Sequence, residues 1–303
     1  MKIRLLAVVL ALGALVAVAL GGTRARTALD DVQTFKAVTS FPRSYVGIVS
    51  YDLPAFDNQC RCAPNVAAYY THMGGKEPIS MGHAVTALYH GAVPMLELEP
   101  FGLSLATIIA GGADPWLTAY AHAVRNLHAP VIMSFAPEAN GTWYTWGSQD
   151  VTASAYVAAW RHVVSVFRRA GATRVRWAWI VNVNFPGSGN IQKLWPGSKY
   201  VNILGLDGYL TAGSATFEHF FGPTIVDLRG LSGTDPLLIT ETAVAPHAGK
   251  LAGLQKIIAG ISQYNLDGFV WFDVRQRGSA RHQDWRLLNR SLALYVGAVD
   301  KLP

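Results

Sequence analysis

Short, nearly uninterrupted apolar runs alternate with longer amphipathic segments along the chain after residue 40. The runs occupy residues 45–51, 78–83, 93–99, 130–136, 174–181, 201–206, 237–241 and 268–272, and the second is the weakest. Such continuous apolar character is typical of strands that are buried on both faces of a parallel sheet. The pattern therefore predicts eight buried strands separated by helices.

The segments between the runs have the spacing of amphipathic helices. Asp114 as N-cap and Pro115 as first helical residue predict a helix that continues over 116–127. Residues 152–170 repeat apolar side chains at helical spacing, and Gly171 is typical of a helix end. Eight β–α alternations predict a single (β/α)8 barrel, a fold of about 250 residues. A doubly wound open sheet is the alternative, because periodicity does not show whether a sheet closes.

The first 28 residues carry a different pattern from the rest of the chain. Lys2 and Arg4 precede the uncharged apolar run 5–22, which is the arrangement of a secretory signal peptide. Residues 17–19, Ala-Val-Ala, are a candidate cleavage site, and the run is also long enough for a membrane anchor. We therefore expect a secreted or extracytoplasmic protein, which contacts the membrane only if this segment is kept as an N-terminal anchor instead of being cleaved. The expected division is 1–28 as signal peptide or anchor, 29–44 as a short lead-in and 45–303 as the barrel domain.

Composition narrows the class of protein. The chain has 303 residues, of which 51% are hydrophobic and 15% are charged, so it is not a disordered polymer. Its formal net charge is +6, but the first 28 residues contribute four of the positive charges. The rest is nearly balanced and has no basic cluster among aromatic residues, so we do not expect nucleic acid as a partner. Cys60 and Cys62 are too few for a disulfide scaffold, and we expect a local bridge or unpaired thiols.

Two carboxylates stand where the fourth and seventh apolar runs end. Glu138 follows the run 130–136, and Glu241 is the last residue of the run 237–241. They are separated by about three β–α units of about 31 residues each, so their strands would face each other across a barrel. Catalytic groups of such barrels lie at the carboxyl ends of the strands. Glycosidic-bond cleavage needs one protonated carboxyl for the leaving oxygen and one ionised carboxylate for the anomeric carbon.

Several segments around these carboxylates form a recognisable series. They are EANGTWYTWG at 138–147, WAW at 177–179, WPGSKYVN at 195–202, GLDGY at 205–209, TET at 240–242 and WFD at 271–273. In order and spacing, the series resembles glycoside hydrolase family 26, the β-mannanase family of retaining (β/α)8 enzymes. The resemblance covers roughly residues 45–290, and the segments at 138–147 and 205–209 are its most specific parts.

The resemblance implies roles for individual residues. Glu138 would be the general acid/base and Glu241 the nucleophile of a two-step retaining mechanism that needs no cofactor or metal. Tyr209 would donate a hydrogen bond to Glu241, and Asp207 could brace the loop after the sixth strand. We also expect one of the two tryptophans of WAW to face the barrel interior. The implied substrate-binding residues are Asn140, Trp143, Tyr144, Trp146, Trp179, Tyr209 and Trp271.

One departure from the family pattern concerns the substrate. Pro137 stands where the family usually has a His that contacts the sugar in the cleaved subsite, and an upstream family Arg is also absent near Ser134 and Ala136. Because Pro offers no side-chain donor and no backbone N–H, recognition at this point must differ. The resemblance favours β-1,4-mannan as substrate, and we expect a monomer. A β-glucan, a β-1,3-xylan or the producing cell's own exopolysaccharide remain alternatives, as do a silent carbohydrate-binding barrel and an unrelated chemistry.

Overall fold

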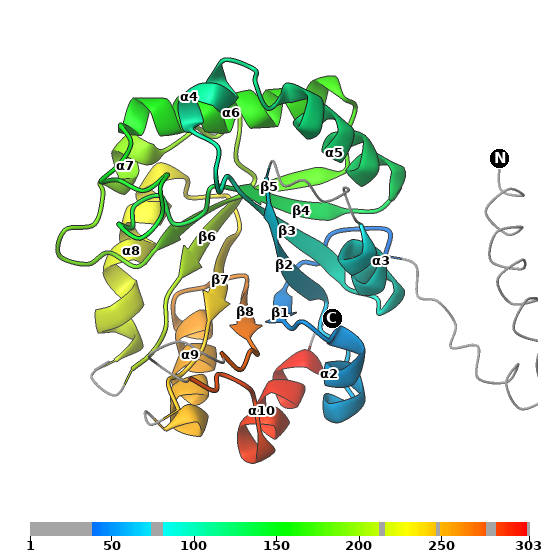
Figure 1. The fold of residues 1–303 in the computed structure, drawn as a ribbon. Helices are drawn as coiled ribbons and strands as arrows, with labels where there is room; N and C mark the ends of the chain where they lie inside the picture. The colour runs from blue at the N-terminus through cyan, green and yellow to red at the C-terminus, as the bar shows by residue number, and fades with distance from the viewer. Residues whose placement is uncertain (1–37, 74–80, 212–215, 247–248, 277–282, 302–303) are drawn as a thin grey trace, which may run out of the picture. The chain divides into compact units, whose positions relative to one another are not determined.

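The strands of the protein close into a barrel. The computed structural model describes residues 38–73, 81–211, 216–246, 249–276 and 283–301. Eight parallel strands pair in sequence order from β1 to β8, and β1 also pairs with β8 (Figure 1). The predicted (β/α)8 barrel is therefore confirmed, and the β1–β8 pairing excludes the open sheet. The expected signal peptide or anchor at 1–28 lies outside the described residues.

Each strand is followed by one or more helices that lie outside the barrel (Figure 1). The strands are β1 (Tyr45–Val49), β2 (Val66–His72), β3 (Val93–Glu99), β4 (Val131–Phe135), β5 (Val175–Asn182), β6 (Ile203–Asp207), β7 (Leu237–Thr242) and β8 (Gly268–Phe272). The helices are α2 (Leu53–Cys60), α3 (Gly82–Tyr89), α4 (Leu105–Ile109), α5 (Asp114–Asn126), α6 (Ala153–Arg169), α7 (Ile191–Leu194), α8 (Phe217–Leu231), α9 (Lys250–Gln263) and α10 (Asn289–Val299). Within the described residues, no helix is long and apolar enough to span a bilayer.

The prediction for the second strand was wrong. Of the run 78–83, residues 78–80 lie outside the described part, and Gly82 and His83 begin α3 instead of ending a strand. The true strand, β2, has the sequence VAAYYTH and pairs in register with β1 and β3. Its second half carries polar tips that interrupt the apolar run, although Tyr and Thr are good strand formers. Polar groups in a barrel strand are expected where the strand reaches the functional end.

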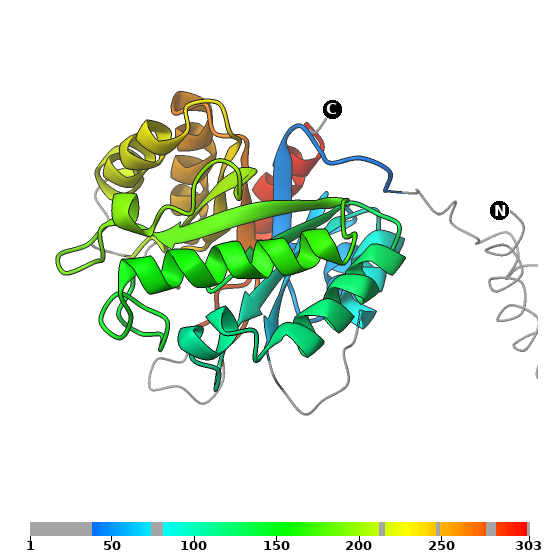
Figure 2. The same ribbon diagram turned by 90° about the horizontal axis from the view of Figure 1, so that it is seen from above.

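Aromatic side chains hold helix α6 against the barrel, and a side chain that was expected to cap α5 joins α5 to α6. Helix α6 lies alongside strand β5 (Figure 2). Trp177 of β5 packs against Trp160 and Phe167 of α6, with ring centroids 6.2 and 5.1 Å apart. Asp114 does not cap α5, because Ala113 occupies the N-cap position. Asp114 instead accepts a hydrogen bond at 2.6 Å from His162 of α6, which joins the two neighbouring helices.

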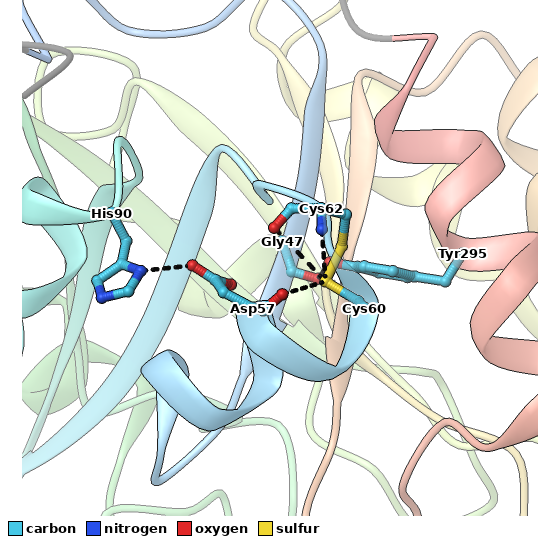
Figure 3. Close-up of a disulfide and its surroundings, with 6 residues drawn as sticks. All are labelled: Gly47, Asp57, Cys60, Cys62, His90 and Tyr295. Carbon is cyan, nitrogen blue, oxygen red and sulfur yellow. Dashed lines mark hydrogen bonds and ion pairs between the residues drawn. A yellow bond between two sulfur atoms is a disulfide. The ribbon is translucent and has the colours of Figure 1, made fainter. Parts of the chain in front are cut away.

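Cys60 and Cys62 form a disulfide (Figure 3). Of the two expected states, a local bridge or unpaired thiols, the structure has the local bridge. Their Cα atoms are 5.1 Å apart, in the turn between α2 and β2. Asp57 of the same helix is 2.6 Å from the ring of His90, which follows α3 (Figure 3). This turn precedes a strand, so the bridge lies at the amino ends of the strands, the end opposite to the paired carboxylates.

Candidate active site

A cavity of about 490 Å³ opens at the carboxyl ends of the strands and contains both predicted catalytic residues. Glu138 and Glu241 line it together with three further carboxyls, those of Glu97, Glu99 and Asp207. The fold therefore brings side chains from opposite sides of the barrel into one space. Over the described part of the chain, no group of three or more His, Cys, Asp or Glu is placed to hold a metal ion.

The backbone around Glu138 is held in an unusual conformation. Ala136 and Glu138 have φ angles of 46° and 55°, in the left-handed region that side chains other than Gly rarely adopt. The Ala136 N–H donates to the carbonyl of Leu98 on β3, and the Glu138 N–H donates to the carbonyl of Ile180 on β5. Because strands on both sides hold this segment, it can keep a strained shape, and such strain tends to occur at functional sites.

Two donors hold the Glu138 carboxyl in place. Asn182, the last residue of β5, donates to one oxygen, and the indole N–H of Trp143 donates to the other at 2.9 Å. Burial raises the pKa of Glu138 above its ordinary value, while both hydrogen bonds lower it. A Cβ at Gly141 would lie 2.5 Å from the Trp143 ring, so the Gly makes room for the indole. The sequence analysis did not identify Asn182 as a site residue. The available signal was its position as a polar residue directly after the apolar run 174–181.

The Glu241 carboxyl lies between two phenols. Tyr209 donates to one carboxylate oxygen, as the resemblance implied, and Tyr70 donates to the other. The pairing of β6 with β7 shifts register at Asp207 and Glu241, an irregularity of the kind that re-aims side chains near active sites. Burial raises the pKa of Glu241 to about 8; the Tyr70 hydrogen bond lowers it and the nearby carboxyls raise it. Tyr70 was missed because its strand was missed.

Aromatic residues of the loop 138–147 divide into exposed and supporting ones. The Trp143 side chain is 49% exposed and stacks on Phe185, with ring centroids 5.7 Å apart. Tyr144 lines the cavity and stacks on Trp146 at 4.3 Å. Trp146 is buried, and its indole N–H donates to the carbonyl of Pro137 at 2.8 Å. Trp143 and Tyr144 therefore remain available to a sugar, whereas Trp146 supports the loop from below.

Three further expected substrate contacts are buried away from the cavity. Trp177 and Trp179 are two residues apart on one strand and so lie on the same face. Trp177 packs on α6, so both face the helices, and the expectation that one of them faces inward was wrong. Trp271 is fully buried, and its indole N–H donates to the carbonyl of Trp285. Asn140 is also fully buried. Its amide group donates to the carbonyl of Asn182 and accepts from the N–H of Asn182, and so braces the loop 138–147 against β5.

The sequence reasoning passed over Glu99 and His72, which also line the cavity, whereas it expected Asp207 to act as a brace. Glu99 at the end of β3 lies 3.2 Å from the imidazole of His72 at the end of β2, and the Phe101 ring packs on that imidazole. Asp207 is buried and accepts a hydrogen bond at 2.7 Å from Thr240, which braces β6 against β7. The signal for this wall is the segment 97–99, Glu-Leu-Glu, which puts two carboxyls on one face of an otherwise apolar strand.

A closed barrel that joins two carboxyls from its fourth and seventh strands in one cavity is the arrangement of a glycoside hydrolase. Residues 115–273 match the sequence model described as glycosyl hydrolase family 26. The chain belongs to glycosyl hydrolase family 26, and the resemblance found in the sequence is confirmed.

Individual relatives agree with this assignment. Endoglucanase H of Acetivibrio thermocellus is 30% identical to this chain over 231 residues, which cover 70% of the chain and 25% of that protein. The chain thus spans a quarter of the length of this relative. The catalytic domain of an endo-β-1,4-mannanase from Bacillus sp. JAMB-750 superposes with a TM-score of 0.62 at 19% identity, covering 81% of this chain and 78% of that one. A β-mannanase from Bacteroides ovatus gives 0.62 at 16% identity, covering 89% and 90%. At such identities the two structures show a shared fold.

Proposed function

We propose that the protein is a retaining β-glycoside hydrolase in which Glu138 is the acid/base and Glu241 the nucleophile. The observation that carries this proposal is the single cavity that both carboxyls line, half-buried and each held by two hydrogen-bond donors. Positioned carboxyls of this kind are the chemical requirement for cleaving a glycosidic bond. None of the steps requires a cofactor.

The reaction would proceed in two displacements. Ionised Glu241 attacks the anomeric carbon while protonated Glu138 gives its proton to the departing oxygen, so a glycosyl ester forms as the glycosidic bond breaks. Glu138, now ionised, then takes a proton from a water molecule, whose oxygen attacks the anomeric carbon and releases Glu241. Two inversions leave the anomeric configuration of the product unchanged.

The surroundings of the two carboxyls fit this division of labour. Two phenol hydroxyls point at the Glu241 oxygens and stabilise the ionised form, because a hydrogen bond to a carboxylate is stronger than one to a neutral acid. Burial raises the pKa values of both groups, and the charges of Glu138 and Glu99 raise that of Glu241 further. When one member of the pair ionises, it makes the second ionisation harder, so the pair retains one proton over part of the pH range.

β-1,4-Mannan is the proposed substrate, and a β-glucan is the second candidate. Mannanases of family 26 share the fold, whereas the relative with 30% identity is an endoglucanase. Pro137 supports a difference from the family pattern in the cleaved subsite, since it can offer no hydrogen-bond donor. β-1,3-Xylan and an exopolysaccharide of the producing cell complete the substrates to be compared.

The deciding experiment measures reducing-end release from mannan, glucomannan, lichenan and β-1,3-xylan. We expect one polymer to be cleaved, with an initial product of β configuration by NMR. Glu241→Ala and Glu138→Ala should each lower kcat by roughly three orders of magnitude or more. Asp300→Ala, at an exposed residue that follows α10, is the matched control that should leave the rate unchanged. A folded wild-type protein that binds a polymer without cleaving it would instead establish the silent carbohydrate-binding barrel.

We also propose that the chain is exported. Lys2, Arg4 and the apolar run 5–22 support a signal peptide or anchor. Fusion of residues 1–44 to a reporter that is active only outside the cytoplasm should give an active reporter. Replacement of two leucines of the run by Arg should abolish it, and an active reporter in that variant would contradict export through this segment.

A further inference from the structure

The end of the barrel opposite to the cavity collects positive charge. Helices α5 and α6 end there (Figure 2), and their last turns contain Arg125 and Arg168. Arg174 directly precedes β5, and Lys199 lies in the segment between α7 and β6. Cations are favourable at the carboxyl ends of helices, which accounts for Arg125 and Arg168. The helix dipole does not account for Arg174 or Lys199.

Exposed cations at this end form a surface that we call the cationic face, which consists of Arg125, Arg161, Arg168, Arg174 and Lys199. Within the described part of the chain, none of them forms an ion pair with a carboxylate. The arginines donate instead to the backbone carbonyls of Ala170, Pro196, Lys199, His128 and Thr39. A carbonyl fixes a guanidinium in place without neutralising its charge, and each guanidinium keeps further N–H donors for a ligand.

Three members of the cationic face surround one aromatic ring. The guanidinium carbons of Arg161 and Arg168 lie 5.4 and 5.5 Å from the centroid of the Tyr200 ring, and the ammonium nitrogen of Lys199 lies 5.8 Å from it. The ring attracts cations through its quadrupole, which offsets part of the repulsion between the three charges. An anion bound among them would remove the rest of that repulsion.

The other two members line a small cavity. It has a volume of about 120 Å³, and its charged or polar side chains are those of Arg125, His128, Thr173 and Arg174. No carboxyl is among its described lining residues. Because a guanidinium can form two parallel hydrogen bonds with phosphate oxygens, a concave site with two such groups suits a phosphate.

Neighbouring carboxylates do not balance this charge. Asp114 already pairs with His162 and Arg169, and the carboxylate of Asp267 accepts a hydrogen bond from the N–H of Leu237, next to β7. The cationic face therefore keeps its positive charge. Its members come from two helices and two connecting segments, so the sequence shows no basic cluster there.

The N-terminal segment joins the barrel beside the cationic face. The carbonyl of Thr39 accepts a hydrogen bond from Arg174 at 2.7 Å, and the centroid of the Phe41 ring lies 4.4 Å from the guanidinium carbon of Arg176. Residues 23–37 separate this point from the apolar run 5–22, and a chain of that length spans at most about 50 Å. If the run is retained as an anchor, the cationic face stays within reach of the bilayer surface.

We propose that the cationic face binds the phosphate headgroups of a bilayer that contains anionic lipid. The chain leaves the barrel toward the apolar run from beside this face, which favours a bilayer over a soluble polyanion as the partner. With this face on the membrane, the cavity that contains Glu138 and Glu241 opens on the side away from the membrane. The inference goes beyond the proposed reaction, and it rests on the proposed export for the compartment in which the face meets a bilayer.

Vesicle binding by the full chain tests the proposal. Leu10→Gln, Leu12→Gln and Leu15→Gln are introduced together to weaken bilayer binding by the apolar run, and neutral phosphatidylcholine vesicles measure what remains of it. The anionic vesicles contain about 30% phosphatidylglycerol, and cosedimentation measures binding to both kinds. We expect binding to the anionic vesicles to be at least about tenfold tighter at about 0.1 M salt, where the Debye length is about 10 Å. The difference should disappear at about 1 M salt, where that length is about 3 Å.

Paired variants in the same background assign the binding to the cationic face. Arg168→Gln with Lys199→Gln should weaken binding to anionic vesicles by about tenfold or more, since each cation near such a surface contributes a factor of about five. Lys193→Gln with Arg290→Gln is the matched control, because it removes the same charge from exposed residues in the first turns of α7 and α10, toward the cavity end. It should weaken binding by less than about twofold, because screening limits the attraction of charges that lie far from the bilayer.

Fluorescent labels identify the end of the barrel that meets the bilayer. Both native cysteines are in the disulfide, so an introduced cysteine can carry an environment-sensitive dye. Ser198→Cys places the dye beside Lys199, and Ser154→Cys places it in the first turn of α6, at the cavity end. We expect the larger change in emission on anionic vesicles at Ser198→Cys. A larger change at Ser154→Cys would overturn the proposal.

Three other results would also overturn it. They are equal binding to both kinds of vesicle, an equal loss of binding in the two pairs of variants, and tighter binding to heparin than to the anionic vesicles. The last would favour a soluble polyanion as the partner. An unchanged midpoint of urea unfolding shows that Arg168→Gln with Lys199→Gln is folded. None of these measurements requires cleavage of a glycan, so failure of this inference is distinguishable from failure of the proposed hydrolase activity.

Discussion

The two catalytic candidates are each defined by residues far away in the sequence. Glu241 receives hydrogen bonds from Tyr70 and Tyr209, and Glu138 receives one from Asn182. Only Trp143 belongs to the same loop as the carboxyl that it contacts. At the scale of single residues, the site is therefore a set of hydrogen-bond donors that stabilise the ionised forms of two half-buried acids. Removal of one donor should raise the pKa of its acid and leave the surrounding fold unchanged.

Tyr70→Phe tests this view at the nucleophile. The Tyr70 hydroxyl stabilises ionised Glu241, so its loss raises the pKa of Glu241 and leaves less of the reactive form at a given pH. A hydrogen bond to a charged group contributes about 1.5–3 kcal/mol, so the acidic limb of the kcat/KM profile should move up by about 1–2 pH units. Tyr120→Phe removes a buried hydroxyl that bonds Thr71 outside the cavity lining and should leave the limb in place. An unshifted limb with activity lost equally at every pH would contradict this role.

Gly141→Ala tests the packing beneath the acid/base. The new Cβ would lie within 2.5–2.7 Å of the Trp143 ring, so the indole must move and its hydrogen bond to Glu138 is lost. We expect kcat to fall about tenfold, together with a change in tryptophan fluorescence. Gly230→Ala in α8 is the matched control, because a Cβ there meets nothing within 4 Å. A wild-type rate in Gly141→Ala would show that the contact between Trp143 and Glu138 is dispensable.

At the scale of elements, the barrel separates chemistry from support. The cavity residues stand at the carboxyl ends of the strands, where β4 ends in a strained segment and β7 carries a register shift. The disulfide between α2 and β2 stands at the other end. The length of the strands separates the two ends of the barrel, so a substitution at the amino ends can alter stability without altering the cavity at the carboxyl ends.

The disulfide should therefore affect stability and leave catalysis alone. The Cys60→Ser, Cys62→Ser double variant removes a very short loop closure, for which chain entropy predicts about 1–2 kcal/mol of lost stability. Urea unfolding monitored by fluorescence measures this loss, and kcat/KM should match the wild type. A reducing agent should destabilise the wild type by the same amount and the double variant not at all. A changed kcat/KM would mean that the turn reaches the cavity.

At the scale of the whole molecule, the buried acids couple folding to pH. Burial raises the pKa of Glu99 to about 7 and of Glu241 to about 8, and it raises those of Glu97, Glu138 and Asp207 as well. These groups hold protons in the folded state that they release on unfolding in the same pH range. The folded state thus binds more protons than the unfolded state between the ordinary carboxyl pKa and the raised ones.

The free energy of unfolding should consequently fall as pH rises from about 5 to about 8, by about 1.4 kcal/mol per pH unit for each proton held in excess. Glu241→Gln removes one of these groups, so its stability should depend less on pH and exceed that of the wild type at about pH 8. Denaturant unfolding at several pH values measures both slopes. A stability that rises over this range would show that the acids are ionised in the folded protein without cost.

The amino-acid sequence alone was enough to predict the barrel and to place two candidate catalytic carboxyls in its cavity. Hydrophobic periodicity is a local property, and strand ends place the residues that follow them in a known position of a barrel. For this reason Glu138 and Glu241 could be named before any contact was known. The exception was β2, whose tyrosines interrupt the apolar run that marks the other strands.

Only the tertiary structure decided which side chains surround those carboxyls. Trp179 and Trp271 proved to be buried, whereas Tyr70 and Asn182 proved to be donors to Glu241 and Glu138. Which face a strand residue presents, and which residue meets it across the barrel, depend on register and on bulges between strands far apart in the chain. These relations are long-range, so no local pattern of residues encodes them.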